Sequence, residues 1–188
     1  MNDMSDLSDP QTSDDMTALG SGRFYGKYRG TVINNIDPMQ IGRIMALVPD
    51  VSGFLPTSWA LPCLPWGGIQ TGVFCVPIIG AGVWIEFEQG DPDYPIWTGC
   101  FWGIAAEVPA LALAGNPASP SIVLQTTLQN SLSISDLPGP TGGIMIKSMG
   151  GATITVNETG IVIQNGQGAS IAMVGPSVTI NAGGLVVI

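Results

Sequence analysis

Two pairs of carboxylates are the densest candidate chemistry in this chain of 188 residues. Glu86 and Glu88 lie two residues apart in VWIEFE, so on a strand they would share a face and could act as paired acid and base. The same spacing also suits a solvated outer face or a contact with a neighbouring subunit. Asp91 and Asp93 could bind a hard cation through oxygen, but their Gly-Asp-Pro-Asp context is typical of a turn.

Other catalytic arrangements lack a partner residue. The chain contains no histidine, so no imidazole can activate a serine, threonine or cysteine. Lys27 and Lys147 are conceivable bases, but neither lies in a recognisable motif. The glycines of NGQG and NAGG join β-favouring runs and open no helix, so they are interpreted as tight turns with positive φ. We therefore expect no catalytic residue, no cofactor and no metal site.

Charge and composition limit which partners the chain can bind and in which cellular compartment it is expected to assemble. The net charge is −9, and five aspartates fall within residues 1–22; such a surface would repel a phosphate backbone. No apolar run reaches the roughly 18 residues that a membrane-spanning helix needs, and the acidic N-terminus does not read as a secretory signal. These features predict cytoplasmic assembly, no integral membrane segment and no nucleic-acid partner. Cys63, Cys75 and Cys100 lack CxxC spacing, which predicts buried, reduced thiols.

The strongest pattern in the chain is a repeat in residues 144–188. Short β-favouring runs alternate with Gly, Asn and Pro, and each run carries two apolar residues two positions apart. Alternation places both on one face of a strand, and a fixed repeat of short strands indicates a stacked, elongated β architecture. One residue from each run gives steps of eight or nine positions: Ile146, Ile154, Ile163, Ile171, Ile180 and Ile188.

This apolar series has no cover within the segment itself. A narrow ribbon of strands leaves its edges open, whereas identical copies wrapped about a common axis would bury the series and pair the edges. We therefore predict an intertwined oligomeric β-rod with the six isoleucines in its core. Its outward positions are polar and nearly uncharged, which suits entry into a bilayer because hydroxyls and amides cost less to desolvate than ions; they are Thr153, Thr155, Gln164, Ser170, Thr179 and Asn181.

The rest of the chain divides into three segments ahead of the rod. Residues 1–22 predict an acidic disordered tail, either a solubilising leader or a docking segment. Residues 23–106 contain about five β-rich runs separated by turn formers, which fits a small closed OB-fold barrel. Residues 107–120 (EVPALALAGNPASP) read as a proline-limited linker, and residues 121–188 form the rod. The fold class predicted is all-β.

Several stretches of the barrel segment occur in a distinctive order. They are YRGTVINNIDPMQIGRIMALVP, SWALPCLP and GAGVWIEFEQGDPDYPIWTGCFWG. Residues 28–103 resemble the N-terminal barrel of the phage baseplate assembly protein V family, also found in VgrG spikes of type VI secretion, and residues 121–188 resemble the β-helical spike that follows it. The resemblance implies a non-enzymatic homotrimer, three barrels around the base of a three-stranded β-helix, held in the hub of a contractile injection machine.

The resemblance also suggests what lies at the two ends of such a spike. Some family members hold iron at the apex through a His-x-His arrangement, which this histidine-free chain cannot supply. The end at NAGGLVVI instead suggests a separate PAAR-type tip protein seated on Leu185, Val186, Val187 and Ile188. The barrels would dock to hub or tube proteins, and the rod would make transient contact with the target membrane.

Two other classes of function stay open. A β-helix could be a carbohydrate-binding or adhesin-like module, which a groove lined with acids would favour. An OB-fold could instead bind single-stranded nucleic acid by stacking bases on aromatic side chains. The barrel segment does hold five tryptophans, but with only four basic residues beside them they are better explained as core or subunit-contact residues: Trp59, Trp66, Trp84, Trp97 and Trp102.

Overall fold

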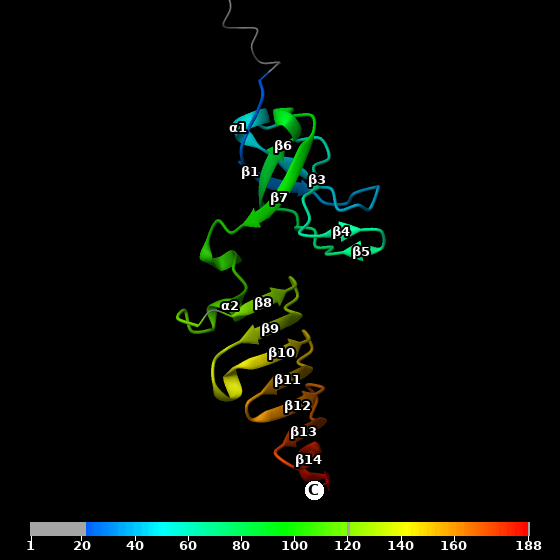
Figure 1. The fold of residues 1–188 in the computed structure, drawn as a ribbon, viewed down its shortest axis with the longest axis vertical. Helices are drawn as coiled ribbons and strands as arrows, with labels where there is room; N and C mark the ends of the chain where they lie inside the picture. Colours follow the sequence, from blue (N-terminus) through cyan, green and yellow to red (C-terminus); the bar gives the residue numbers. More distant parts are fainter. Residues whose placement is uncertain (1–21, 120, 188) are drawn as a thin grey trace, which may run out of the picture. The chain divides into compact units, whose positions relative to one another are not determined.

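The computed structural model describes residues 22–119 and 121–187. These residues form two compact units, the first ending at Gly103 and the second beginning at Ile104. Both are built from strands joined by turns, and the helices are single turns (Figure 1). The all-β class predicted from the alternating runs is confirmed. The acidic tail was predicted for residues 1–22, and all of it except Gly22 lies outside the described part of the chain.

The first unit carries seven strands and two short helical turns. They are β1 (Tyr28–Asn34), β2 (Met45–Leu47), α1 (Pro49–Ser52), β3 (Leu61–Pro62), β4 (Gly67–Gly68), β5 (Thr71–Gly72), β6 (Gly82–Phe87), η1 (Glu88–Gly90) and β7 (Pro95–Phe101). Five of the strands form one sheet in the order β2-β1-β6-β7-β3, and β4 pairs only with β5.

The five-stranded sheet curls until its two edges meet. Neighbouring strands pair antiparallel except β3 and β7, which are parallel. An isolated bridge then joins Ile44 to Ala60, ahead of β2 and β3, through two backbone hydrogen bonds of 2.8 and 3.2 Å. This bridge brings the edge strands together, as the OB-like architecture requires.

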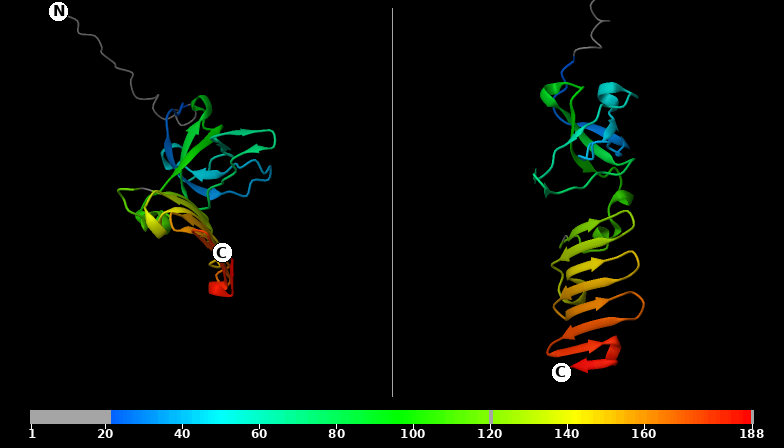
Figure 2. Two further views of the ribbon diagram at one scale, coloured as in Figure 1. Left: turned by 60° about the horizontal axis from the view of Figure 1, so that its bottom comes forward. Right: turned by 90° about the vertical axis from the view of Figure 1, so that its right-hand side faces the viewer.

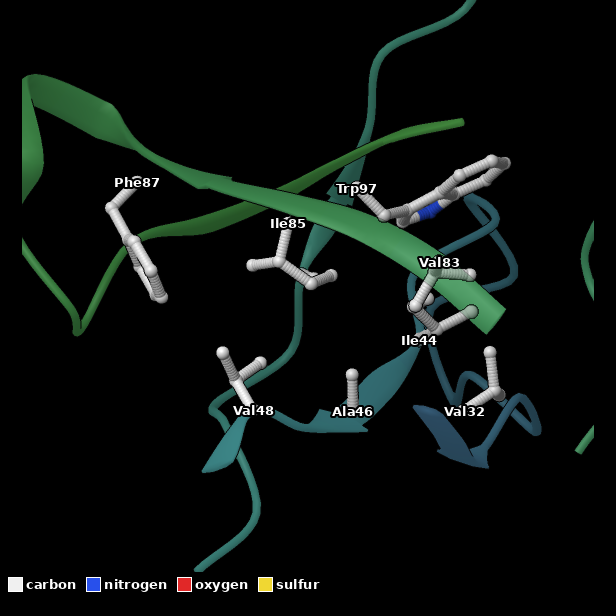
Figure 3. Packing of buried hydrophobic residues seen from close by; sticks show 9 residues of the cluster. Val32, Ile44, Ala46, Val48, Val83, Ile85, Phe87 and Trp97 are labelled. Carbon is white, nitrogen blue, oxygen red and sulfur yellow. The ribbon is translucent and has the colours of Figure 1, made fainter. Parts of the chain in front are cut away.

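Alternation along β6 supplies much of the barrel core. Val83, Ile85 and Phe87 are buried, and the residues between them are half-buried on the outer face. Figure 3 shows these side chains meeting residues of β1, β2 and β7 in one cluster. Trp97 closes one side of the cluster and donates its indole N–H to the Gly42 carbonyl at 3.0 Å. A buried indole with a satisfied donor adds apolar contact without an unpaired polar group.

The second unit is a ladder of short strands preceded by two helical turns. Its elements are η2 (Ala105–Glu107), α2 (Ala110–Leu113), β8 (Ile122–Gln125), β9 (Ser131–Ser135), η3 (Gly139–Thr141), β10 (Gly143–Lys147), β11 (Thr153–Asn157), β12 (Gly160–Gln164), β13 (Ser170–Val174), β14 (Ser177–Ile180), η4 (Asn181–Gly183) and β15 (Leu185–Val187). The ALALA stretch thus supplies α2, the one turn of helix allowed by its prolines.

Strands β8 to β15 form a single antiparallel sheet in chain order. Figure 2 shows the strands stacked one after another, each crossing the sheet and returning through a turn. All of the pairing described here is therefore between successive strands of one chain, and one copy contributes one complete sheet.

Asparagines and glycines make the turns of this ladder tight. The Asn165 carboxamide oxygen accepts backbone N–H groups of Gln167 and Ala169 at 2.9 and 3.0 Å, which closes the turn between β12 and β13. Gly160 begins β12 with φ +150°, and a Cβ there would overlap the Met173 carbonyl oxygen. Only glycine allows the strands to approach this closely at that position.

Candidate functional site

The ladder sheet presents two parallel rows of apolar residues on one face. Strand register places one residue of each strand opposite the next. We call the row nearer the 148–152 and 165–169 turns the first row: Leu124, Leu132, Ile146, Ile154, Ile163, Ile171, Ile180 and Leu185. The second row runs beside it through Ile122, Ile134, Ile144, Val156, Ile161, Met173, Val178 and Val187.

The first row contains five of the six isoleucines predicted for the core of the rod. Ile146, Ile154, Ile163, Ile171 and Ile180 are consecutive partners across β10 to β14. Beyond Ile180 the next partner is Leu185, because the turn through η4 is short. Asn181 and Ala182 make that turn at φ +51° and +52°. Ile188, the sixth predicted member, lies outside the described residues.

Sequence reasoning missed the start of both rows. Leu124 and Leu132 precede the regular repeat, and the Pro- and Gly-rich loop 136–142 separates them from Ile146 and breaks the eight- or nine-residue spacing. The alternation within SIVLQ and SLSIS was the available signal, since it repeats the two-residue period of the later strands.

These rows are open to solvent in a single chain. Ile146 is 51% exposed and Ile154, Ile163 and Ile171 remain about as exposed, at 38–41%. They border a shallow groove of about 680 Å³, lined almost wholly by apolar atoms. Covering an aliphatic side chain that is roughly half exposed is worth about 1 kcal/mol, and the rows repeat that gain along eight strands. A face of this extent requires a partner surface.

The opposite face of the sheet mixes polar and small residues with a few larger apolar ones, such as Met145 and Val162. Thr155 lies beside Met145 and Val162 in register, and Thr179 lies beside Ala172. Near the start of the ladder this face is covered by its own chain, since Ser131 and Ser133 are buried. Leu111 and Ala114, on and just after α2, line a small cavity there together with Ser133 and Ser135. The covering segment leaves the apolar rows untouched.

The candidate carboxylates of the barrel do not assemble a catalytic site. Glu86 is on β6 and accepts a hydrogen bond from the Lys27 ammonium group at 2.7 Å. Glu88 belongs to η1, beyond the end of the strand, so the expectation that the two share a strand face is wrong. The Gln89 backbone at φ +52° turns the chain there. Asp91 accepts the Asp93 backbone N–H at 3.1 Å, as a turn-forming aspartate does.

The cysteines are reduced, as predicted, but they are not buried. Cys63, Cys75 and Cys100 are free and exposed in the single chain: Cys63 and Cys75 lie in irregular segments, and Cys100 lies near the end of β7. Desolvation by neighbouring atoms raises the pKa of the Cys100 thiol, and the nearby Cys75 adds to the shift. Among residues 22–119 and 121–187, no group of three or more His, Cys, Asp or Glu side chains could hold a metal ion.

Aromatic residues of the barrel serve three different roles. Trp97 lies in the core, whereas Trp66 and Trp102 are 58% and 62% exposed. Trp84 packs against Phe101 on the outer face with ring centroids 4.9 Å apart, and the Arg29 guanidinium lies over both rings at 5.2 and 4.9 Å. This cation–π stack was not predicted.

Comparison with known proteins assigns the two units separately. Residues 28–102 match the family model described as the type VI secretion system/phage-baseplate injector OB domain. Residues 121–186 match the phage baseplate V C-terminal trimerisation domain. The second match covers the eight-stranded sheet nearly end to end.

A curated relative agrees with these matches over a short stretch. The type VI secretion system spike protein VgrG5 of Pseudomonas aeruginosa is 37% identical over 51 residues. That stretch is 27% of this chain and 6% of the relative, so the chain spans a small fraction of that protein's length.

The matches explain the open apolar face, because a trimerisation domain covers such a face with two further copies of itself. No helix in the described part of the chain is long and apolar enough to cross a membrane. The chain therefore belongs to the phage baseplate V and VgrG-like spike family, as a non-enzymatic structural component of a baseplate that forms homotrimers through its C-terminal domain.

Proposed function

We propose that the trimer is the central spike of a contractile injection machine: its barrels dock to hub or tube proteins, its ladder carries a PAAR-type tip protein, and the assembly pierces the target membrane. The observation that carries the proposal is the ladder itself. Three sheets joined by their apolar rows make a narrow, stiff prism whose outer face holds few charges. Within residues 121–188 the charged side chains are Asp136, Lys147 and Glu158.

A tip protein would sit on the last strand of the described ladder. β15 pairs with β14 on one side only, so its other edge offers unpaired backbone groups to a partner. Leu185 is 55% exposed and continues the first row, so it also offers apolar surface. We propose residues 185–188 as the tip interface on these grounds.

A truncation tests the tip assignment. A chain lacking residues 185–188 should stay a folded trimer, because β8 to β14 keep both apolar rows, but should no longer co-purify with a co-produced PAAR-type protein. Analytical ultracentrifugation checks the trimer and affinity capture checks the tip. Tip capture equal to that of the full chain would contradict the assignment.

The lining of the ladder groove and the scarcity of basic residues on the barrel disfavour the two competing classes of function. The described groove of the ladder is lined by isoleucines and not by acids, so it does not fit a carbohydrate site. The exposed aromatics of the barrel lie beside too few cations to follow a phosphate backbone.

A further inference from the structure

A second apolar surface lies on the barrel unit, on two segments that project from it. The loop between β1 and β2 and the hairpin of β4 and β5 extend from the sheet side by side, in blue and teal in Figures 1 and 2. We call their exposed side chains the apolar arm surface: Ile36 (78% exposed), Met39 (62%), Ile41 (45%), Trp66 (58%), Ile69 (97%) and Phe74 (72%).

The two segments are fastened to each other. The Asn35 carboxamide donates to the Pro77 carbonyl at 2.9 Å, joining the loop to the irregular segment that follows the hairpin. The Phe74 ring lies against the loop backbone, since a Cβ built at Gly42 would be 3.5 Å from it. Within the hairpin, the Trp66 indole N–H donates to the Thr71 hydroxyl at 3.4 Å. The two segments therefore lie against each other.

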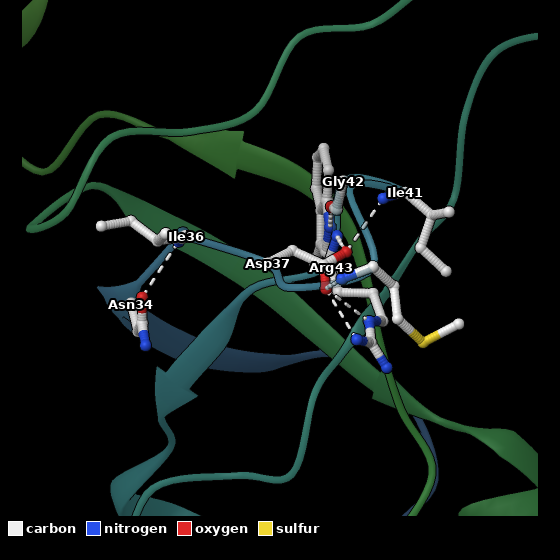
Figure 4. A network of polar contacts seen from close by, with 8 residues as sticks. Asn34, Ile36, Asp37, Ile41, Gly42 and Arg43 are labelled. Atoms are coloured by element: carbon white, nitrogen blue, oxygen red, sulfur yellow. Dashed lines mark hydrogen bonds and ion pairs between the residues drawn. The ribbon is translucent and has the colours of Figure 1, made fainter.

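The loop is held in one conformation by a charged clasp at its centre. Figure 4 shows the Asp37 carboxylate accepting hydrogen bonds from the backbone N–H groups of Ile41 and Arg43 and from the Arg43 guanidinium. The shortest of these joins Arg43 Nη2 to Asp37 Oδ1 at 2.6 Å, and the Arg43 side chain also lies over the Trp59 ring. Preorganised apolar side chains lose little conformational entropy when a partner covers them.

The apolar arm surface carries no free charge. Residues 64–80 contain no Asp, Glu, Lys or Arg, and within residues 33–42 the one charged residue is Asp37, which is buried in its clasp. Depletion of charge together with exposed aromatic and Met side chains is typical of the core of a lasting protein–protein interface. A polar or acidic segment such as residues 1–22 is a poor match for it.

We propose that the apolar arm surface of one barrel packs against the barrel of another copy within the same trimer. The C-terminal domain already holds three copies together, and residues 104–121 tether each barrel to the first ladder strand. Barrels tethered in this way meet at an effective concentration on the order of millimolar, so a modest apolar contact is populated. The inference depends on trimerisation and is independent of the tip and membrane steps proposed above.

Footprinting of the full-length trimer tests the contact. Phe74 and Phe54 are matched in chemistry and are 72% and 93% exposed in the single chain, so hydroxyl radicals should modify them at similar rates if both are free. We expect Phe74 to be modified several-fold more slowly than Phe54 in the purified trimer without other proteins. Equal rates would overturn the proposal, as would protection of Phe74 that develops only after a hub protein is added.

Paired variants separate a contact between copies from cover by the chain itself. Ile69→Ser changes a side chain that is 97% exposed in the single chain, and Phe54→Ser is its matched control. Ile69→Ser should lower the unfolding midpoint of the trimer while Phe54→Ser leaves it unchanged; unchanged midpoints for both would contradict the proposal.

Dissociating the trimer by dilution should expose Phe74. Protection that persists in the monomer would show that its own chain covers the surface, and would overturn the inference while leaving the proposed spike function intact.

Discussion

Asp37 is the residue on which the shape of the loop between β1 and β2 depends. Its carboxylate gathers backbone N–H groups from Met39, Ile41 and Arg43 in addition to the Arg43 side chain. The hydrogen bond from the Arg43 guanidinium is the main cause that lowers the pKa of Asp37 far below its ordinary value of 3.8. Charge-assisted hydrogen bonds of this kind favour the ionised form.

The lowered pKa links the clasp to acid stability. In the unfolded chain the Asp37 carboxylate takes up a proton near its ordinary pKa, whereas in the folded chain it does so only at a much lower pH. The clasp therefore stabilises the fold fully above about pH 4 and progressively less as the pH falls below that value. Asp37→Asn should lower the unfolding midpoint of the barrel at neutral pH and flatten its decline in acid. Circular dichroism melts from neutral pH down to pH 2 would measure both effects.

The control for this variant is the exposed Asp93→Asn, which lies in a turn and should preserve the wild-type pH profile. If Asp37→Asn and wild type lost stability in parallel over the same acid range, the clasp would not be the source of the pH dependence.

At the scale of elements, the two-residue alternation of apolar and polar side chains fixes which face of the ladder each residue occupies. Each strand offers two inward and two or three outward positions, and a slip of one residue would exchange the faces. The contrast is sharpest on β12, where Ile163 belongs to the first row and the adjacent Gln164 lies on the opposite face, both exposed in the single chain.

This contrast gives a matched test of the predicted rod core. Ile163→Lys should prevent trimer formation, because three ammonium groups would be buried near one another without partners, at a cost of several kcal/mol each. Gln164→Lys adds the same charge one position away and should leave the trimer intact. Sedimentation equilibrium of both variants gives the answer, and a stable Ile163→Lys trimer would remove the first row from the interface.

The sequence was most informative where the period of two is uninterrupted. Alternation in β10 to β14 predicted the apolar pairs and the series from Ile146 to Ile180, because one buried face fixes the side on which each residue lies. Alternation alone could not establish register across turns of unequal length. The turn at Asn181 and Ala182 shows this, since it makes Leu185 the partner of Ile180 three positions before the spacing predicted one.

The barrel was predictable as a class but not in its surface chemistry. The buried alternation of Val83, Ile85 and Phe87 follows directly from VWIEFE. The pairing of Asp37 with Arg43 depends on how a loop folds back on itself, and the contact of Arg29 with Trp84 depends on neighbouring strands. Neither contact has a periodic signal in the sequence.

For the whole molecule, the two units differ in what they can bury alone. All of the buried apolar side chains among the described residues lie between Val32 and Trp97, in the barrel. The ladder buries only Ser131 and Ser133 and leaves its isoleucines for other copies. Folding of the ladder is therefore coupled to assembly, and its stability depends on the concentration of chains, as in other obligate oligomers.

The difference between the two faces of the ladder matters for the membrane step of the proposed function. In the proposed spike, a prism whose apolar rows face inward would present its opposite faces to the bilayer. On that face Thr179 lies beside Ala172 with no charged neighbour in register. Hydroxyl groups cost little to transfer out of water compared with carboxylates, whose desolvation costs several kcal/mol each even after relaxation.

Adding charge to the outer face should therefore impair puncture without affecting assembly. The variant Thr179→Glu places one carboxylate on the outer face of every copy, and Thr179→Ser is the matched control. We expect both to form trimers and to enter assembled particles, while the glutamate variant releases dye from target-lipid vesicles on contraction much less than the serine variant. Equal release would mean that the sheath's work exceeds the desolvation cost, or that the ladder never enters the bilayer, and the membrane step of the proposed function would then lose its physical basis in this face.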